Sequence, residues 1–176
     1  MLPMETIFNL SNLFIMPFWF LMILLPHWRW TQRIMATLWP IVALAVLYAL
    51  LLFSQIGGNA GDLLNPTLTG IAALLSTPAG ATTGWVHFLA FDLFVGRWVY
   101  LDSRVLGISA WPVAPALFLV LMTGPLGLLL YLLVRLIWRR LFMASNSNYI
   151  QLDSADERTS AIALDSPGSA GLQSGS

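Results

Sequence analysis

The chain has 176 residues and no formal net charge, with eight arginines, no lysine and eight acidic residues. Hydrophobic residues make up 58% of the sequence and charged residues 9%, whereas a soluble domain carries about 25% charged residues, so the composition is that of an integral membrane protein. Balanced charge argues against a nucleic-acid partner, and the absence of cysteine excludes disulfides and thiolate metal sites.

Four long apolar runs predict transmembrane helices, namely residues 6–26, 37–56, 81–101 and 113–137. At about 1.5 Å per residue, each run can span a hydrocarbon core of about 30 Å. Helices satisfy their own backbone amides in lipid, so we predict an all-α, polytopic four-helix transmembrane bundle over residues 1–144.

The remaining segments are taken in chain order. The first run has no basic residue before it and no small-residue cleavage site after it, so we expect it to be retained as a helix rather than removed as a secretion signal. Over residues 67–77 we predict a short helix that lies at the membrane interface or dips part-way into the membrane. The sequence Thr123-Gly124-Pro125 predicts a break in the fourth run. The tail, 145–176, is rich in Ser, Gly and acidic residues and predicts disorder.

The arginines leave the membrane orientation open. Arg29, Arg33 and Arg104 assign the first and third loops between runs to the cytoplasmic side. Four crossings then place a second group of arginines on the opposite side, which the same rule disfavours: Arg135, Arg139 and Arg140. A full crossing by residues 67–77 would remove the conflict, but it requires an unusually thin helix.

The third run carries the residues most indicative of function. Asp92 lies near its midpoint, and His87 and Arg97 lie five positions away on either side. A charged residue at mid-membrane costs roughly 2.5–3.5 kcal/mol and usually marks a functional site or a specific buried pair. At about 100° per residue, His87 and Arg97 share a broad face and Asp92 points away from both, so this helix should be central in the bundle.

Each of these side chains also has a structural interpretation. Asp92 and Arg97 can simply join helices together, with Asp92–Asn12 and Arg97–Tyr131 as possible contacts, and His87 can be a structural hydrogen bonder. The sequence offers two histidines, no cysteine and no carboxylate at helical spacing from a histidine, so we expect no metal site.

Three stretches together resemble one known family. They are residues 84–98 with Asp102 and Gly107-Ile108, residues 17–19 with 25–31, and residues 124–131. Over residues 5–137 the chain resembles the neoxanthin-synthase-like family of plastids and cyanobacteria, which is named for an abscisic-acid-deficient mutant. Because no Ser/Arg-rich transit extension precedes the first run, we expect a bacterial member, located as a multi-pass protein in a cyanobacterial inner or thylakoid membrane.

The resemblance implies a carotenoid-linked role, since plastid members are required for converting violaxanthin to neoxanthin. That reaction is an isomerisation without a required cofactor, and it needs one group to protonate the epoxide oxygen and another to remove a proton from the polyene. On this interpretation Asp92 is the acid, His87 the base and Arg97 the stabiliser of charge on oxygen. The candidate substrate-binding residues are Trp85, Trp98, Tyr100, Asn12 and Tyr131.

Two alternatives remain open at this point. The first is a non-enzymatic carotenoid-binding or assembly factor, with pigment held in a groove of Trp and Phe side chains. The second is a proton or ion pathway through the charged residues of the third run. The expected partners are membrane lipids and a carotenoid ligand, and a homo-oligomer or a membrane-protein partner is left open.

Overall fold

The computed structural model describes residues 3–64 and 67–141, with side chains at 3–55 and 67–141. This part of the chain is all-α, as predicted, and the predicted disordered tail lies outside it. The helices are α1 (Met4–Leu24), α2 (Arg29–Ala36), α3 (Trp39–Leu64), α4 (Leu68–Leu75), α5 (Pro78–Val105) and α6 (Ala110–Thr123). A further helix begins at residue 125 and is described to residue 141; we call it the C-terminal helix. All contacts discussed below lie within one compact unit, Met1–Arg135.

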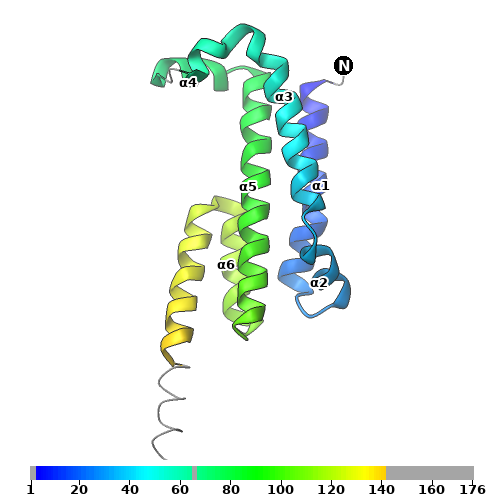
Figure 1. Cartoon of the computed structure of the whole chain (residues 1–176), viewed down its shortest axis with the longest axis vertical. Coiled ribbons are helices and arrows are strands. Elements are labelled where there is room, and N and C mark those ends of the chain that lie inside the picture. The colour runs from blue at the N-terminus through cyan, green and yellow to red at the C-terminus, as the bar shows by residue number, and fades with distance from the viewer. Residues whose placement is uncertain (1–2, 65–66, 142–176) are drawn as a thin grey trace, which may run out of the picture. The chain divides into compact units, whose positions relative to one another are not determined.

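Helix α5 occupies the centre of this unit. It contacts α1, α3, α4 and α6, and Figure 1 shows α1, α3 and α5 side by side, with α2 and α4 at opposite ends of them. A helix with polar side chains on both sides was expected to be central, and that expectation is confirmed. The short helix expected within 67–77 is α4, whose N-terminus is capped by the Thr67 hydroxyl, which accepts a hydrogen bond from the Gly70 amide at 3.1 Å.

The close packing of α1 on α5 depends on a glycine. The Trp19 side chain is 1% exposed, and a Cβ built on Gly96 would lie 2.5 Å from its indole ring. Because Cβ atoms do not approach other atoms this closely, α5 accommodates the indole only with glycine at this position. Both residues belong to the stretches that carry the family resemblance, so part of that resemblance reflects packing.

The predicted fourth run, 113–137, is not one helix. Helix α6 ends at Thr123, and the C-terminal helix begins at residue 125, so the break expected at 123–125 is present. Gly124 has φ +55°, a conformation that L side chains rarely adopt, and Pro125 favours the first position of a new helix. The two helices turn back on each other, since a Cβ on Gly127 would overlap the backbone of Val120.

The length and apolarity of the described helices support fewer crossings than the four that were predicted. Helix α1 passes both criteria, and α2 with residues 39–55 of α3 forms a second candidate that is bent by 44°. Helix α5 has 28 residues, enough to cross, but it includes Asp92, Arg97 and Asp102. The four-helix transmembrane bundle is therefore not confirmed.

Candidate functional site

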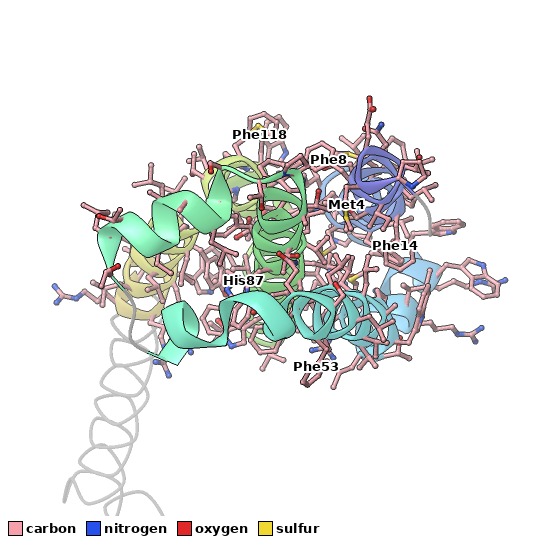
Figure 2. All side chains as sticks on the ribbon, turned by 90° about the horizontal axis from the view of Figure 1, so that it is seen from above. Met4, Phe8, Phe14, Phe53, His87 and Phe118 are labelled. Atoms are coloured by element: carbon pink, nitrogen blue, oxygen red, sulfur yellow. The ribbon has the colours of Figure 1, made fainter. Side chains whose placement is uncertain are left out.

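The N-terminal half of α5 borders a pocket of about 400 Å³ between α3, α4 and α5. Its walls are mainly aliphatic, with four polar side chains among them: Tyr48, Gln55, Thr83 and His87. Pockets of 300–1,000 Å³ that combine apolar walls with a few polar groups are typical of small-molecule sites. Figure 2, which views the bundle from above, shows His87 between α5 and α3, whereas Phe53 and Phe118 point outward.

Residues at the start of α5 shape the end of this pocket where α4 crosses. Thr77 caps the N-terminus of α5 by accepting a hydrogen bond from the Gly80 amide at 3.0 Å, and Pro78 occupies the first turn. A Cβ on Gly80 would overlap the backbone carbonyl of Leu74, so the absent side chain lets α4 cross close to α5. The glycine therefore positions α4 as one wall of the pocket.

His87 is held among aromatic rings. Its ring centroid lies 5.2 Å from that of Tyr48 on α3 and 4.7 Å from that of Phe91 on α5. Within the described ranges, the imidazole has no hydrogen-bond partner and no ion pair, and it is only partly exposed. An imidazole without a protein partner in a partly enclosed pocket is free to accept or donate a hydrogen bond to a ligand.

Thr83 lies one helical turn before His87 on α5 and is bonded to Gln55 on α3. Gln55 Nε2 donates to Thr83 Oγ1 at 2.6 Å and to the Leu51 carbonyl at 3.1 Å, and Thr83 Oγ1 donates to the Ala79 carbonyl at 2.9 Å. The Gln55 carbonyl oxygen and the His87 imidazole therefore both remain available. Sequence reasoning missed Gln55, Thr83 and Tyr48 as site residues; the i, i+4 spacing of Thr83 and His87 on one face was the available signal.

Asp92 lies on another side of α5, beside the turn between α6 and the C-terminal helix. A Cβ on Gly124 would lie 2.5 Å from its Oδ1 atom. In the part of the chain with assigned side chains, the carboxyl group has no hydrogen bond and no ion pair. The predicted contact with Asn12 does not form, because Asn12 Oδ1 accepts from Trp85 Nε1 at 2.9 Å.

Arg97 binds the carboxyl end of α2. Its Nε donates to the carbonyls of Met35 at 2.7 Å and Thr37 at 3.2 Å, and its Nη2 donates to the carbonyl of Ala36 at 3.2 Å. The last carbonyls of a helix lack intrahelical partners and carry partial negative charge, so a guanidinium is favoured there. The predicted contact with Tyr131 is not present, and the structure does not bring Arg97, His87 and Asp92 to one centre.

The predicted substrate-binding residues also separate into different surroundings. Trp85 joins Asn12 on α1, and Tyr100, 1% exposed, donates to the Pro26 carbonyl at 2.7 Å. The Trp98 and Tyr131 rings meet edge to face, with centroids 5.6 Å apart. None of these five side chains lines the pocket around His87.

Asp102, one of the residues that carry the family resemblance, organises the C-terminal half of α5. Its carboxylate accepts from the Tyr131 hydroxyl at 2.5 Å and from Arg135 Nη2 at 3.2 Å, and Arg135 Nε lies 2.8 Å from Oδ2 as an ion pair. The Arg135 guanidinium also lies 5.9 Å from the Trp98 ring. Together these contacts attach the C-terminal helix to α5.

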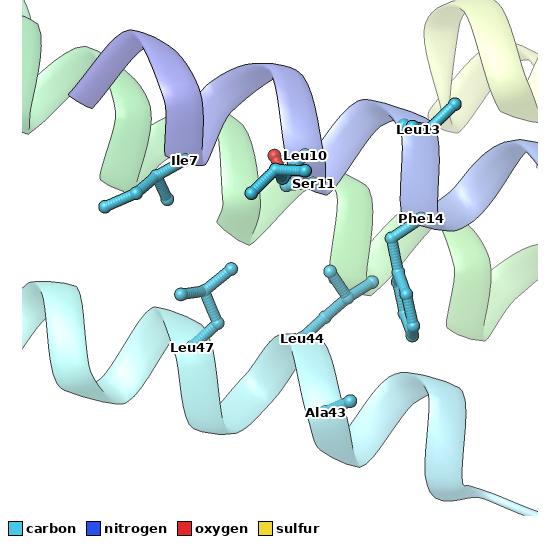
Figure 3. A pocket seen from close by; sticks show the side chains of 8 residues that line it. All are labelled: Ile7, Leu10, Ser11, Leu13, Phe14, Ala43, Leu44 and Leu47. Carbon is cyan, nitrogen blue, oxygen red and sulfur yellow. The ribbon is translucent and has the colours of Figure 1, made fainter. Parts of the chain in front are cut away.

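An apolar groove of about 460 Å³ lies between α1 and α3 (Figure 3). Its lining is aliphatic and aromatic apart from one serine: Ile7, Leu10, Ser11, Leu13, Phe14, Ala43, Leu44 and Leu47. Such a surface suits a hydrocarbon chain and offers almost no polar group to orient a ligand. Among the described side chains, no cluster of three His, Asp or Glu residues is placed to hold a metal ion.

Comparison with known proteins identifies the family. Residues 6–131 match the family described as ABA DEFICIENT 4-like. The chain is 30% identical over 105 residues to the protein ABA DEFICIENT 4, chloroplastic, of Arabidopsis thaliana; the aligned region is 56% of this chain and 48% of that protein. The chain thus spans about half the length of this curated relative. No solved structure matches. Because this match covers most of the chain, the protein belongs to the ABA DEFICIENT 4-like family.

Proposed function

We propose that this protein is a multi-pass membrane protein with a role in carotenoid metabolism. The composition, the apolar helix α1 and the lengths of α3 and α5, 26 and 28 residues, support the membrane assignment. Large apolar side chains on the outside of the bundle support it further, because they suit contact with acyl chains: Phe20, Phe53, Phe88 and Phe91, each more than half exposed. A cyanobacterial inner or thylakoid membrane is the proposed location.

The pocket around His87 is the proposed binding site for one oxygenated end ring of a carotenoid. The pocket volume, about 400 Å³, accommodates a substituted ring but not a whole carotenoid, so the polyene would continue along the apolar exterior. The single observation that carries this proposal is the unpaired imidazole of His87 between Tyr48 and Phe91, in a pocket whose other polar side chains are those of Tyr48, Gln55 and Thr83. Those groups can bind a hydroxyl or an epoxide oxygen.

The proposed reaction is isomerisation of an epoxy-carotenoid of the violaxanthin-to-neoxanthin type. A proton leaves the polyene carbon next to the epoxide, the adjacent C–O bond breaks, a new C=C bond forms and the oxygen gains a proton. The reaction moves one proton from carbon to oxygen with no change in oxidation state. The single imidazole of His87 can therefore remove the proton as a base and return it as an acid.

Asp92 and Arg97 take different roles in this proposal from those assigned by the sequence analysis. Their neighbours, Gly124 and the carboxyl end of α2, lie away from the His87 pocket. We therefore propose Arg97 as a positioning residue for the α2–α3 connection. Asp92 is proposed to lie outside the site, where its carboxylate packs against the glycine of the turn at Gly124.

A non-enzymatic carotenoid-binding or assembly function is the second candidate. It is favoured by the composition of the described pocket lining, which contains one imidazole, that of His87, and no Asp, Glu or Arg side chain. A single imidazole suffices for binding and orienting a pigment. In this candidate the same imidazole binds the ring oxygen, and no bond is broken.

The decisive experiment expresses the full chain together with a violaxanthin-producing pathway and analyses both total and co-purified pigment. The isomerase proposal predicts a new allenic pigment with the wild-type chain and none with His87→Gln. His27→Gln, which changes the other histidine at an exposed position outside the pocket, should behave like wild type. Asp92→Asn should retain conversion, whereas its loss with Asp92→Asn alone would restore Asp92 as the acid.

The remaining outcomes separate the two candidates. Pigment that co-purifies unchanged with the wild-type chain, and is lost with His87→Gln, would support the binding factor and overturn the isomerase. Folded wild-type protein that is colourless and leaves the pigments unconverted would overturn both.

A further inference from the structure

The turn at Gly124 reverses the direction of the chain after α6. Helix α6 has 14 residues, a rise of about 21 Å, which is less than the hydrocarbon core of about 30 Å. If the C-terminal helix continued in the same direction, Tyr131 would lie about 30 Å from the start of α6. Instead its hydroxyl donates to Asp102, three residues before α5 ends at Val105. The C-terminal helix therefore returns to the end from which α6 started (Figure 1).

The geometry of the turn favours this hairpin over a kinked crossing. Gly124 has a positive φ, and its backbone lies against the Asp92 carboxylate near the middle of α5. Gly127 and Val120 approach so closely that no Cβ fits between them. The ion pair of Arg135 with Asp102 then fixes the returning helix against the C-terminal part of α5.

This hairpin brings Arg135 to the end of the compact unit that carries Arg29, Arg33 and Arg104. Arg29 and Arg33 lie on α2, with their guanidinium groups 5.9 and 5.4 Å from the Trp30 ring, and both are exposed. Arg104 is exposed at the end of α5, and Arg135 reaches Asp102 at the same end. At the opposite end, α4 has no charged residue and α1 carries Glu5.

We propose that α6 and the C-terminal helix form a re-entrant hairpin inserted from the arginine-bearing end, so that the chain crosses the membrane three times and presents the exposed Arg29, Arg33 and Arg104 to acidic lipid headgroups of one leaflet. This inference depends on the membrane assignment in the proposed function but not on the carotenoid chemistry. It removes the conflict that four crossings create, since Arg135 joins Arg29, Arg33 and Arg104 on one side. By the same rule that side faces the cytoplasm. Arginine–tryptophan surfaces at the interface fit anionic headgroups.

Single-cysteine labelling tests the crossing number, because the natural chain contains no cysteine. The variants are Gln32→Cys on α2, Glu5→Cys at the start of α1 and Arg139→Cys, all at exposed positions. Arg139 is four residues beyond Arg135, too few to reach the other side of the membrane at about 3.5 Å per residue. Each full-length variant is treated with a membrane-impermeant maleimide in sealed vesicles of both orientations.

The hairpin predicts that Gln32→Cys and Arg139→Cys are labelled from one side and Glu5→Cys from the other. Labelling of Arg139→Cys together with Glu5→Cys would mean four crossings and would overturn the hairpin. Release of the wild-type chain from membranes by alkaline carbonate would overturn the membrane assignment itself, and the hairpin with it.

The headgroup contact is tested with spin-labelled lipids in phosphatidylcholine vesicles containing the full chain. The wild-type chain should select phosphatidylglycerol over phosphatidylcholine, and each arginine near the surface contributes about fivefold. The double variant Arg29→Gln/Arg33→Gln should lose most of this selectivity, while Glu5→Gln at the other end should retain it. Equal association of both lipids with the wild-type chain would overturn this part of the proposal.

Discussion

The N-terminal and C-terminal halves of α5 differ in how their polar side chains are paired. In the C-terminal half, Arg97 binds three carbonyls, Tyr100 binds the Pro26 carbonyl and Asp102 binds Tyr131 and Arg135. In the N-terminal half, Thr83 and Trp85 are hydrogen-bonded, but His87 has neither a hydrogen bond nor an ion pair with any residue whose side chain is described, and the same holds for Asp92 at the middle of the helix. The two halves belong to one helix and share the same neighbours α1 and α3.

This difference separates scaffold from site. Polar groups inside a protein are nearly always hydrogen-bonded, and those in the C-terminal half of α5 follow that rule. His87 departs from it beside a pocket, where a ligand can supply the missing partner. Substitutions in the C-terminal half should therefore reduce stability, whereas substitution of His87 should reduce ligand binding and leave stability nearly unchanged.

The largest effect is expected where the hairpin that packs on the C-terminal half turns back. Gly127→Ala places a Cβ on the Val120 backbone, and separating the two helices should cost about 3 kcal/mol. The measurement is the unfolding midpoint in detergent, followed by circular dichroism.

Gly107→Ala is the matched control for this prediction. Gly107, unlike Gly127, has a positive φ, +64°, and a Cβ there meets nothing within 4 Å. Conformational strain alone should then cost about 1 kcal/mol. Equal effects of the two substitutions would contradict the close approach of Gly127 and Val120.

The next effect concerns the network around Asp102. Asp102→Asn removes the ion pair with Arg135 and should cost about 2 kcal/mol, while Tyr131→Phe removes one hydrogen bond and should cost about 1 kcal/mol. Because both substitutions act on one network, the double variant should cost less than the sum of the single variants. The same unfolding measurement checks this, and strict additivity would mean that Tyr131 and Asp102 are not coupled.

The family, the helical class and the central position of α5 were predictable from the sequence. Asp92 and Arg97 are conspicuous in an apolar run, and polar groups on both sides require neighbours on both sides. Thr123-Gly124-Pro125 likewise indicated the break after α6. These inferences depend on composition and on local backbone chemistry, which a sequence contains directly.

The partners of the polar residues were not predictable in the same way. Helical periodicity predicts the angle between His87 and Asp92 but not the helices that they face. Arg97 binds backbone carbonyls, which every residue has, so no residue type in the sequence identifies its partners. The reversal at Gly124 was missed because a break is compatible with a kink or with a hairpin. Contacts in the folded chain distinguish them, such as that of Tyr131 with Asp102, 29 residues away in sequence.

A smaller effect is expected at Arg97. Arg97→Lys retains the charge but replaces the planar guanidinium by a single ammonium group. Because the ammonium cannot reach all three of the Met35, Ala36 and Thr37 carbonyls, the substitution should lower the free energy of unfolding by about 1 kcal/mol. Arg104→Lys, at an exposed position, is the control and should not change the unfolding midpoint. A conversion defect in Arg97→Lys without any loss of stability would instead support a direct role for Arg97 in the reaction.

The smallest change in stability is expected at His87. His87→Gln keeps a hydrogen-bonding side chain of similar length, and no described residue loses a hydrogen bond, so the free energy of unfolding should change by less than about 0.5 kcal/mol. His27→Gln serves as the control for removing an imidazole outside the pocket. Pigment should stabilise the wild-type chain by mass action and should not stabilise the His87→Gln variant. Thermal melts with and without carotenoid measure this difference directly. If His87→Gln lowers the pigment-free midpoint as far as Arg97→Lys does, then His87 belongs to the scaffold, and the two halves of α5 do not differ in the way proposed.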